Sequence, residues 1–422
     1  MFNNLNSKLS NVFITNNKFE YPYLLSSLVF LIYFSILSTV IGTFVLNLSL
    51  VLFCIIFVIF YIKNRKKIEI TSNFKILYIS TLFLILNIIL SDHYLYSTKT
   101  SLGLIKNIIF LIGCYIVFKI DKKIFNNFIK IVFLIFIFTS LDTILQYLTG
   151  KDIFGYSRSL LHYGRLSGPF GDELIVGSFL SKILFVSILY FLPNHKKKYY
   201  DLIFIIFAIV VIFLTKERSA SLMTIFGGFL YIFLRIDKFK YKIISLFLAA
   251  LLIIISISTV PDTFKRFKFI YNSEQNLLDT QWGAHFLTSY EIFKKNPIIG
   301  SGIRTYRFEC SKDYLKNINS KAAELRCSTH PHNFYLEILS DTGILGIGFF
   351  LFFLLQVLKK IIFFYKQKIT DNNLIISICL FSVFFWPLKT TGSIFSSWNS
   401  YFYILSLIVI LYQINFIKLK LR

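Results

Sequence analysis

Long apolar runs separated by short polar, basic segments make up most of this 422-residue chain. A helix needs about 20 apolar residues to cross the hydrocarbon core of a bilayer. Runs that reach or approach this length lie near 23–41, 44–62, 74–91, 101–118, 126–148, 173–192, 200–215, 219–234, 242–260, 335–358, 374–388 and 398–416. The pattern therefore predicts an all-α, polytopic membrane protein with about 12 transmembrane helices.

Composition agrees with this prediction. Hydrophobic residues make up 56% of the chain, including 50 Phe, whereas soluble domains are usually about 45–50% apolar. The first 20 residues are polar and show no cleavable signal-peptide pattern. We therefore expect the first apolar run to remain as a membrane anchor.

The net charge of +24 would suggest nucleic acid as a partner of a soluble protein. Here no nucleic-acid motif accompanies the charge, and Lys and Arg gather in alternate loops. With a cytoplasmic N-terminus, the seven cytoplasmic segments carry 25 Lys and Arg and the five short outside loops carry 7. The positive-inside rule then predicts that both termini are cytoplasmic.

Two predicted outside loops are long enough to carry chemistry, 149–172 and 261–334. The second divides the chain into a bundle of nine helices (1–260), a periplasmic loop domain (261–334) and three last transmembrane helices (335–422). A loop of this length in a tight bundle is usually functional or disordered. Within it, Leu278–Lys295 and Ser311–Ile318 are predicted to form short amphipathic helices.

The clearest chemical motif is His330-Pro331-His332-Asn333, where the long loop re-enters an apolar run. Proline is tolerated in a first helical turn, so His332 is predicted near a helix N-terminus. There the helix dipole favours a neutral imidazole and attracts an anion. A neutral imidazole beside a bound phosphate can accept a proton. The alternative is an interfacial histidine that only caps the helix.

Three glycines follow this motif. Gly343, Gly346 and Gly348 are predicted to be small residues that let neighbouring helices approach closely.

The order of these motifs resembles the O-antigen ligase and polymerase superfamily of bacterial inner membranes. His332-Asn333, followed after nine residues by Gly343-x-x-Gly346, is similar to that family's signature. Three more segments resemble it: Pro-x-x-Gly-x-Gly at 297–302, Arg-x-x-Gly-x-Phe at 165–170, and an outward-facing arginine in the turn 215–220. The resemblance covers residues 150–350 by motif and the rest by topology.

Members of that family transfer a glycan from undecaprenyl diphosphate to an acceptor sugar. The resemblance thus implies a metal-independent glycosyltransferase of the inner membrane, without cofactors and with a periplasmic active site. The acceptor would be the lipid A core for a ligase, or a second lipid-linked glycan for a polymerase. The residues do not separate these two activities. His332 would be the base that deprotonates the acceptor hydroxyl, with His330 and Asn333 beside it in support.

Arginine suits a diphosphate because its planar guanidinium donates hydrogen bonds in pairs. Arg218 lies in a tight outside turn, where the topology rule disfavours positive charge, and is predicted to bind the donor diphosphate. Its alternative role is a snorkelling anchor. Arg165, in a Gly-rich loop, is predicted to bind the same group. Arg304 and Arg307 follow the glycine turn and are further candidates, or merely solvate the loop.

The sequence departs from the family pattern before Trp282. The family often carries an arginine there, whereas this chain has Asp279, Thr280 and Gln281. A second diphosphate-binding arginine is thus unassigned. His285, in the same region, is a supporting candidate, or simply a buried or interfacial histidine.

Five cysteines occur. Cys54, Cys114 and Cys379 lie within predicted spans and are expected to pack as small apolar residues. Cys310 and Cys327 lie in the long loop, and the oxidising periplasm favours a disulfide between them. A metal site using these cysteines would need His330 or His332 as further ligands, and we expect none.

Two other function classes remain open at this point. A non-enzymatic flippase or transporter of lipid-linked glycans would show broken helices in two related halves, with charges near the midplane. Lys106 and Lys182 are the clearly intramembrane charges, but no matching second half is visible. A scaffold protein would need neither His332 nor Arg218.

Overall fold

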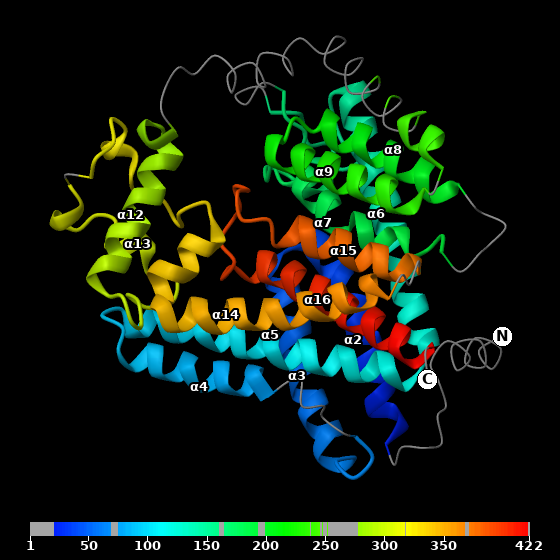
Figure 1. Cartoon of the computed structure of the whole chain (residues 1–422), viewed down its shortest axis with the longest axis horizontal. Helices are drawn as coiled ribbons and strands as arrows, with labels where there is room; N and C mark the ends of the chain where they lie inside the picture. The colour runs from blue at the N-terminus through cyan, green and yellow to red at the C-terminus, as the bar shows by residue number, and fades with distance from the viewer. Residues whose placement is uncertain are drawn as a thin grey trace.

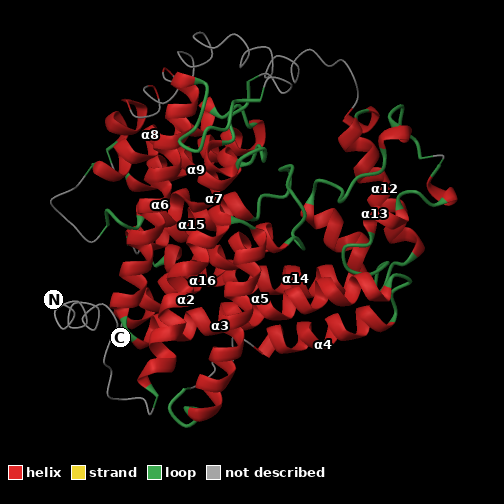
Figure 2. Ribbon diagram, turned by 180° about the vertical axis from the view of Figure 1, so that it is seen from behind, coloured by secondary structure: helices red, strands yellow, loops and turns green. Residues whose placement is uncertain are grey.

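The computed structural model describes residues 21–68, 75–159, 164–192, 199–236, 238–244, 247, 251, 277–316, 318–367 and 371–420. Helices dominate these residues, and no β-strand occurs among them (Figure 2). Two isolated antiparallel bridges, Lys151–Ser157 and Ser159–Arg165, shape the loop after α6. The prediction of an all-α fold is confirmed.

Apart from α12 and α13, which lie in the predicted long loop, the described helices follow the predicted apolar runs. They are α2 (Pro22–Ile41), α3 (Thr43–Lys63), α4 (Lys75–Ile89), α5 (Tyr94–Ile120), α6 (Lys122–Thr149), α7 (Val176–Ile188), α8 (Tyr200–Leu214), α9 (Arg218–Arg235), α12 (Gln281–Lys295), α13 (Tyr306–Glu309), α14 (Phe334–Lys366), α15 (Asn372–Phe384) and α16 (Ser397–Lys420). Short 3₁₀ turns lie at Gly168–Phe170, Leu277–Asp279, Asp313–Leu315 and Ala323–Leu325.

Eleven of the twelve predicted runs contain a helix in the described part of the chain. Most of the remaining run, 242–260, lies outside the described residues. By length and composition, six of the described helices could cross a membrane: α2, α3, α5, α6, α14 and α16. The shorter apolar helices include α7, α8 and α15. A total of 12 spans stays a prediction.

The bundle is built around α16. The apolar span of α16 is 83% buried, against 22% for α14, so α16 is an inner helix and α14 a peripheral one. Figure 1 shows α16 among α2, α5 and α15. Most side chains in the apolar span of α16 are therefore packed against other parts of the protein.

The segment after residue 276 has a small core of its own. Ala284, Ile292, Tyr306, Cys310 and Leu315 pack together, apart from the main core. In Figure 1, α12 and α13 lie over the amino-terminal end of α14. The predicted helix at Leu278–Lys295 is confirmed as α12.

The predicted helix at Ser311–Ile318 is wrong over its described residues, where only the 3₁₀ turn Asp313–Leu315 forms. Lys312 is extended, with φ −65° and ψ 149°. In this conformation the Lys312 ammonium and the Tyr314 hydroxyl both reach the fully buried Glu309 carboxylate. Satisfying a buried charge outweighs the weak helical pattern here.

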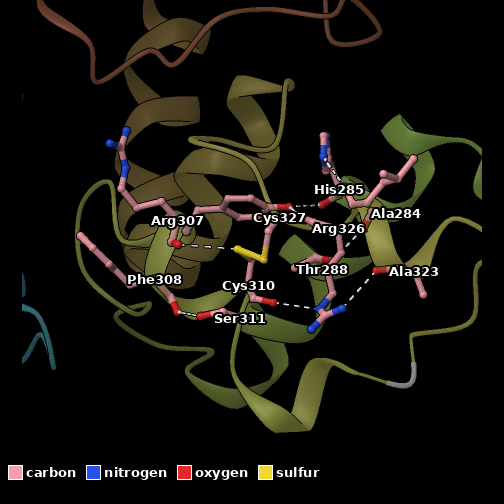
Figure 3. The surroundings of a disulfide bond; sticks show 12 residues. Ala284, His285, Thr288, Arg307, Phe308, Cys310, Ser311, Ala323, Arg326 and Cys327 are labelled. Carbon is pink, nitrogen blue, oxygen red and sulfur yellow. Dashed lines mark hydrogen bonds between the residues drawn. A yellow bond between two sulfur atoms is a disulfide. The ribbon is translucent and has the colours of Figure 1, made fainter.

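A disulfide joins Cys310 and Cys327, whose Cα atoms lie 5.2 Å apart. Figure 3 shows Arg326 beside it, with its guanidinium donating to the carbonyl oxygens of Cys310 (2.9 Å) and Ala323 (3.2 Å). The Tyr306 hydroxyl donates to the Arg326 carbonyl oxygen at 2.7 Å. These bonds fix the loop that leads into the histidine motif.

Candidate active site

Asn333, rather than His332, caps α14. The Asn333 side-chain oxygen accepts hydrogen bonds from the backbone N–H groups of Tyr335 (3.0 Å) and Leu336 (3.2 Å). His332 precedes this cap and has a φ of +59°, in the left-handed region that residues other than glycine rarely adopt. The proposal that His332 merely caps the helix is therefore wrong.

Three imidazoles lie together in front of α14. The His332 ring lies 4.3 Å from the His330 ring and 5.2 Å from the His285 ring, centroid to centroid. The last contact is nearly parallel, at 23°. The structure thus brings His285 on α12 to the histidine motif that sequence analysis placed on a separate segment.

Hydrogen bonds fix two of these rings. His285 Nε2 lies 2.9 Å from the Leu325 carbonyl oxygen, and His330 Nε2 lies 3.1 Å from the Thr391 carbonyl oxygen. Because a carbonyl only accepts, both Nε2 atoms carry the proton of a neutral ring. His332 Nε2 has a longer contact, 3.3 Å, to the Ser328 hydroxyl. His332 is the ring with the weakest hydrogen-bond restraint.

All three imidazoles favour the neutral form. Burial lowers the pKa of His332 below its usual value. Burial, then the neighbouring His332, lowers the pKa of His285 to about 4 and that of His330 to about 4. The sequence had predicted a neutral His332 from the helix dipole, and the structure gives burial as the cause.

The two glycine motifs interlock through their backbones. The N–H groups of Ser301 and Gly302 donate to the carbonyl oxygens of Ser340 (3.1 Å) and Asp341 (3.0 Å). On the other side, the Ile344 N–H donates to the Pro297 carbonyl oxygen at 2.8 Å. The 297–302 turn therefore inserts into α14 and fixes the start of that helix.

The predicted role of the α14 glycines is confirmed in part. A Cβ at Gly346 would meet Phe83 of α4 at 3.1 Å, so α4 does approach closely there. At Gly343 a loop approaches instead of a helix. Gly348 has no atom within 4 Å of its Cβ position, so its predicted role as a contact is wrong.

Arg304 and Arg307 lie beside the histidines. Arg304 has a φ of +63°, and its backbone N–H donates to Asp341 Oδ2 at 2.6 Å. This holds its guanidinium within electrostatic reach of His330 and of the buried Glu337. The Arg307 guanidinium donates to the Thr329 carbonyl oxygen at 3.3 Å. Among the described residues, the buried Nε atoms of both arginines have no hydrogen-bond acceptor.

The Arg165 side chain contacts the turn between α8 and α9. Its guanidinium donates to the Leu174 carbonyl oxygen at 2.6 Å and lies 3.8 Å from the Glu217 carboxylate. Glu217 also accepts from the N–H groups of Gly177 (2.8 Å) and Ser178 (3.2 Å) at the start of α7. These bonds join the Gly-rich loop, α7 and the Arg218 turn.

Arg218 begins α9 and lies across the ring of Trp282 on α12, 5.6 Å from its centroid. No carboxylate of the described residues lies within ion-pair distance of this guanidinium, and the charge of Arg165 is near enough to repel it. The turn therefore presents a cation without a counter-ion to the helix that carries His285.

The sequence did not single out the segment that joins the histidine motif to the Arg218 turn. Residues 385–396, between α15 and α16, extend toward α12 and α13 (Figure 1). The Thr391 N–H donates to the His332 carbonyl oxygen at 2.8 Å, and the Thr390 carbonyl accepts from Ser219, next to Arg218, at 2.9 Å. The Pro387 carbonyl accepts from Asn333 at 2.7 Å. The turn residues Pro387 and Gly392, which interrupt the apolar pattern, were the available signal.

Three segments that carry candidate site residues each contain a residue with a positive φ. Among the described residues other than glycine, φ is positive at Lys216 (60°), Arg304 (63°) and His332 (59°). Each lies in a segment predicted to carry a functional residue. Such conformations cost free energy and gather at functional sites.

Comparison with known proteins agrees with this geometry. Residues 203–351 match the family model described as O-antigen ligase. The match runs from α8 into α14 and includes Arg218, Arg304, Arg307 and His332, together with Trp282. The resemblance to the O-antigen ligase family is confirmed over these residues. Arg165 and the 385–396 segment lie outside the match.

A curated protein of Rickettsia typhi, described as a candidate polysaccharide ligase, is 31% identical over 169 residues. The alignment covers 37% of this chain and 40% of that protein, so the match spans less than half of the relative. Together with the apolar helices, these matches indicate a multi-pass membrane protein.

Proposed function

We propose that this protein transfers a glycan from undecaprenyl diphosphate to an acceptor sugar at the periplasmic face of the bacterial inner membrane. The acceptor is the lipid A core or a second lipid-linked glycan. The O-antigen ligase match and the arrangement of cations and imidazoles support this reaction.

In the proposed step, an acceptor hydroxyl oxygen attacks the anomeric carbon of the donor sugar. The bond from that carbon to the diphosphate oxygen breaks, and the diphosphate leaves with the electron pair. His332 takes the hydroxyl proton, for which a neutral imidazole is required. Arg218 and Arg165 stabilise the charge on the leaving diphosphate, with Arg304 and Arg307 nearer the histidines.

The observation that carries this proposal is the joint attachment of base and cation to two consecutive residues. Thr391 bonds to the backbone of His332 and to the ring of His330, while Thr390 bonds to Ser219, adjacent to Arg218. A proton acceptor and a cation without a counter-ion are thereby held on one short segment. Acyl or glycosyl transfer with an anionic leaving group needs this pairing.

The proposal is tested with purified protein in detergent, lipid-linked donor and acceptor. Loss of glycan from the carrier, with its appearance on the acceptor, is the expected result. Glycan that stays on its carrier while crossing the membrane of a proteoliposome would instead identify a flippase.

Ligase and polymerase are separated in a deletion strain by the banding of surface glycans. Lipid A core without attached polymer indicates a ligase. A single attached repeat indicates a polymerase.

A further inference from the structure

Lys182 of α7 and Lys389 within the 385–396 segment have only neutral hydrogen-bond partners among the described residues. Lys182 of α7 donates to the Ser178 hydroxyl (3.0 Å) and the Asn399 side-chain oxygen (2.7 Å), and lies 4.2 Å from the Trp398 ring centroid. Lys389 donates to the Val383 carbonyl oxygen at 2.8 Å. Within the described residues, neither ammonium has a carboxylate within ion-pair distance.

Aromatic rings surround Lys389. Its ammonium lies 5.3 Å from the ring centroid of Tyr403, 5.5 Å from that of Phe384 and 5.9 Å from that of Phe334. Rings of this kind stabilise a cation without neutralising its charge. Burial, and then repulsion from Lys182, keep the pKa of Lys389 well below its usual value.

The two lysines add to the cations Arg165 and Arg218 described above. Lys182 lies close enough to Lys389 for their charges to repel, and within electrostatic reach of Glu217, which contacts Arg165. Of these side chains, Lys182 and Arg165 are within electrostatic reach of the Glu217 carboxylate. Positive charges gathered in a low-dielectric region cost free energy that an anion would offset.

The residues before Lys389 form an apolar tip. Leu388 is 82% exposed and Trp386 is 38% exposed, with the Trp386 ring against Phe226 of α9 (4.9 Å between centroids). An exposed leucine directly beside a lysine that faces inward is an amphipathic edge. It favours a ligand that carries both a phosphate and a hydrocarbon chain over a free phosphate.

We propose that Lys182 and Lys389 bind the phosphate of a lipid-linked phosphate ligand, whose hydrocarbon chain contacts the tip formed by Trp386, Pro387 and Leu388. The proposal rests on the proposed function only in identifying this ligand with the glycan carrier. It assigns two lysines and an apolar tip to a site for which arginines alone had been considered.

Binding of farnesyl diphosphate to the full chain in detergent tests this site without requiring transfer. Calorimetry should show about a tenfold or greater loss of affinity for Lys182→Gln and for Lys389→Gln. Lys294→Gln is the matched control, because Lys294 is exposed and pairs with Glu291 at 2.7 Å. Inorganic diphosphate and farnesol should each bind at least about tenfold more weakly than farnesyl diphosphate.

A second measurement uses the unaltered protein, in case a variant fails to fold. Acylation of Lys182 and Lys389, followed by mass spectrometry of peptides, should slow when farnesyl diphosphate is bound, while acylation of Lys294 should not. Equal acylation with and without ligand would overturn the proposal, as would unchanged affinity in both variants. Equal binding of inorganic diphosphate would overturn the lipid-linked assignment. If binding of farnesyl diphosphate depends on the two lysines but the protein shows no transfer activity, the proposed function is contradicted and the proposed binding site is still supported.

Discussion

The backbone of Gly343 in α14 lies directly against the backbone of Ile298. A Cβ at position 343 would stand 2.4 Å from the Ile298 carbonyl carbon, and Gly343 has φ +64° and ψ −166° in the middle of a helix. The helix breaks here, and the 297–302 turn occupies the break. The orientation of residues 334–342, and with it the position of His332, depends on this contact.

Gly343→Ala should therefore destabilise the protein. The left-handed conformation alone costs about 1–3 kcal/mol in a residue with a Cβ, and the clash with a backbone atom cannot relax cheaply. Thermal unfolding in detergent measures the effect. The control is Gly348→Ala in the same helix, where no atom lies within 4 Å. Similar shifts for the two variants would show that the Gly343 contact is unimportant.

His332→Ala should lower transfer by about 10²–10⁴-fold, since this is the usual contribution of a general base. The variant should still reach the membrane, because Asn333 rather than His332 caps α14. His330→Ala should be milder, since His330 is held by Thr391 as a neighbour of the reacting ring. Near-normal transfer by His332→Ala would rule out the base assignment.

The pH profile follows from the lowered pKa of His332. A base must be unprotonated, so its activity is present above its pKa and is lost as the pH falls through it. The rate of transfer should be level near neutral pH and reach half of its maximum below about pH 6.5. His285 and His330, with pKa values of about 4, protonate only at still lower pH. A rate that rises with pH through an inflection above pH 7 would require a different base.

Arg218→Lys should keep the fold and lose most of the activity. Lysine supplies charge but lacks the paired donors of a guanidinium, and it stacks less well on Trp282. A hydrogen bond to a charged group contributes about 1.5–3 kcal/mol, which corresponds to roughly ten- to hundredfold in rate. Purified protein with lipid-linked donor provides the assay.

Arg235→Lys is the matched control for this change. Arg235 lies at the other end of α9, where it pairs with Asp201 at 3.1 Å, and lysine can preserve a single ion pair. Activity within about twofold of the parent for Arg218→Lys would favour the anchor role instead.

Thiol labelling of unreduced, denatured protein should modify Cys54, Cys114 and Cys379 and leave Cys310 and Cys327 unmodified. Reduction should then release two further thiols. Closing a loop of about 15 residues contributes roughly 3 kcal/mol in the chain-entropy model, so Cys310→Ser should also lower the unfolding temperature. Five reactive thiols before reduction would exclude the disulfide.

The helices of the bundle were predictable because apolar length decides them with little dependence on tertiary contacts. α12 was predictable for a related reason: Trp282, Phe286, Tyr290 and Phe293 recur at helical spacing. The 311–318 segment was not, since a buried carboxylate at Glu309 overrides its local pattern.

The candidate side chains of the site could be predicted from the sequence, but the way in which they are brought together could not. Sequence motifs identified Arg218 and His332 separately, and a resemblance placed them in one family. The segment between α15 and α16 escaped notice because it acts mainly through backbone atoms, such as the carbonyl oxygens of Pro387 and Thr390 and both groups of Thr391. Any residue has such groups, so side-chain patterns do not report them.

The attachment of Thr390 and Thr391 to opposite halves of the site has a thermodynamic consequence. A ligand that orders the Arg218 side also orders the segment held by His332, so a second ligand on the histidine side meets a partner that is already organised. Donor and acceptor should then bind with positive cooperativity, each raising the affinity for the other by the same factor. Substitutions at residues 390 and 391 should reduce the factor by which donor and acceptor raise each other's affinity, while each ligand still binds by itself.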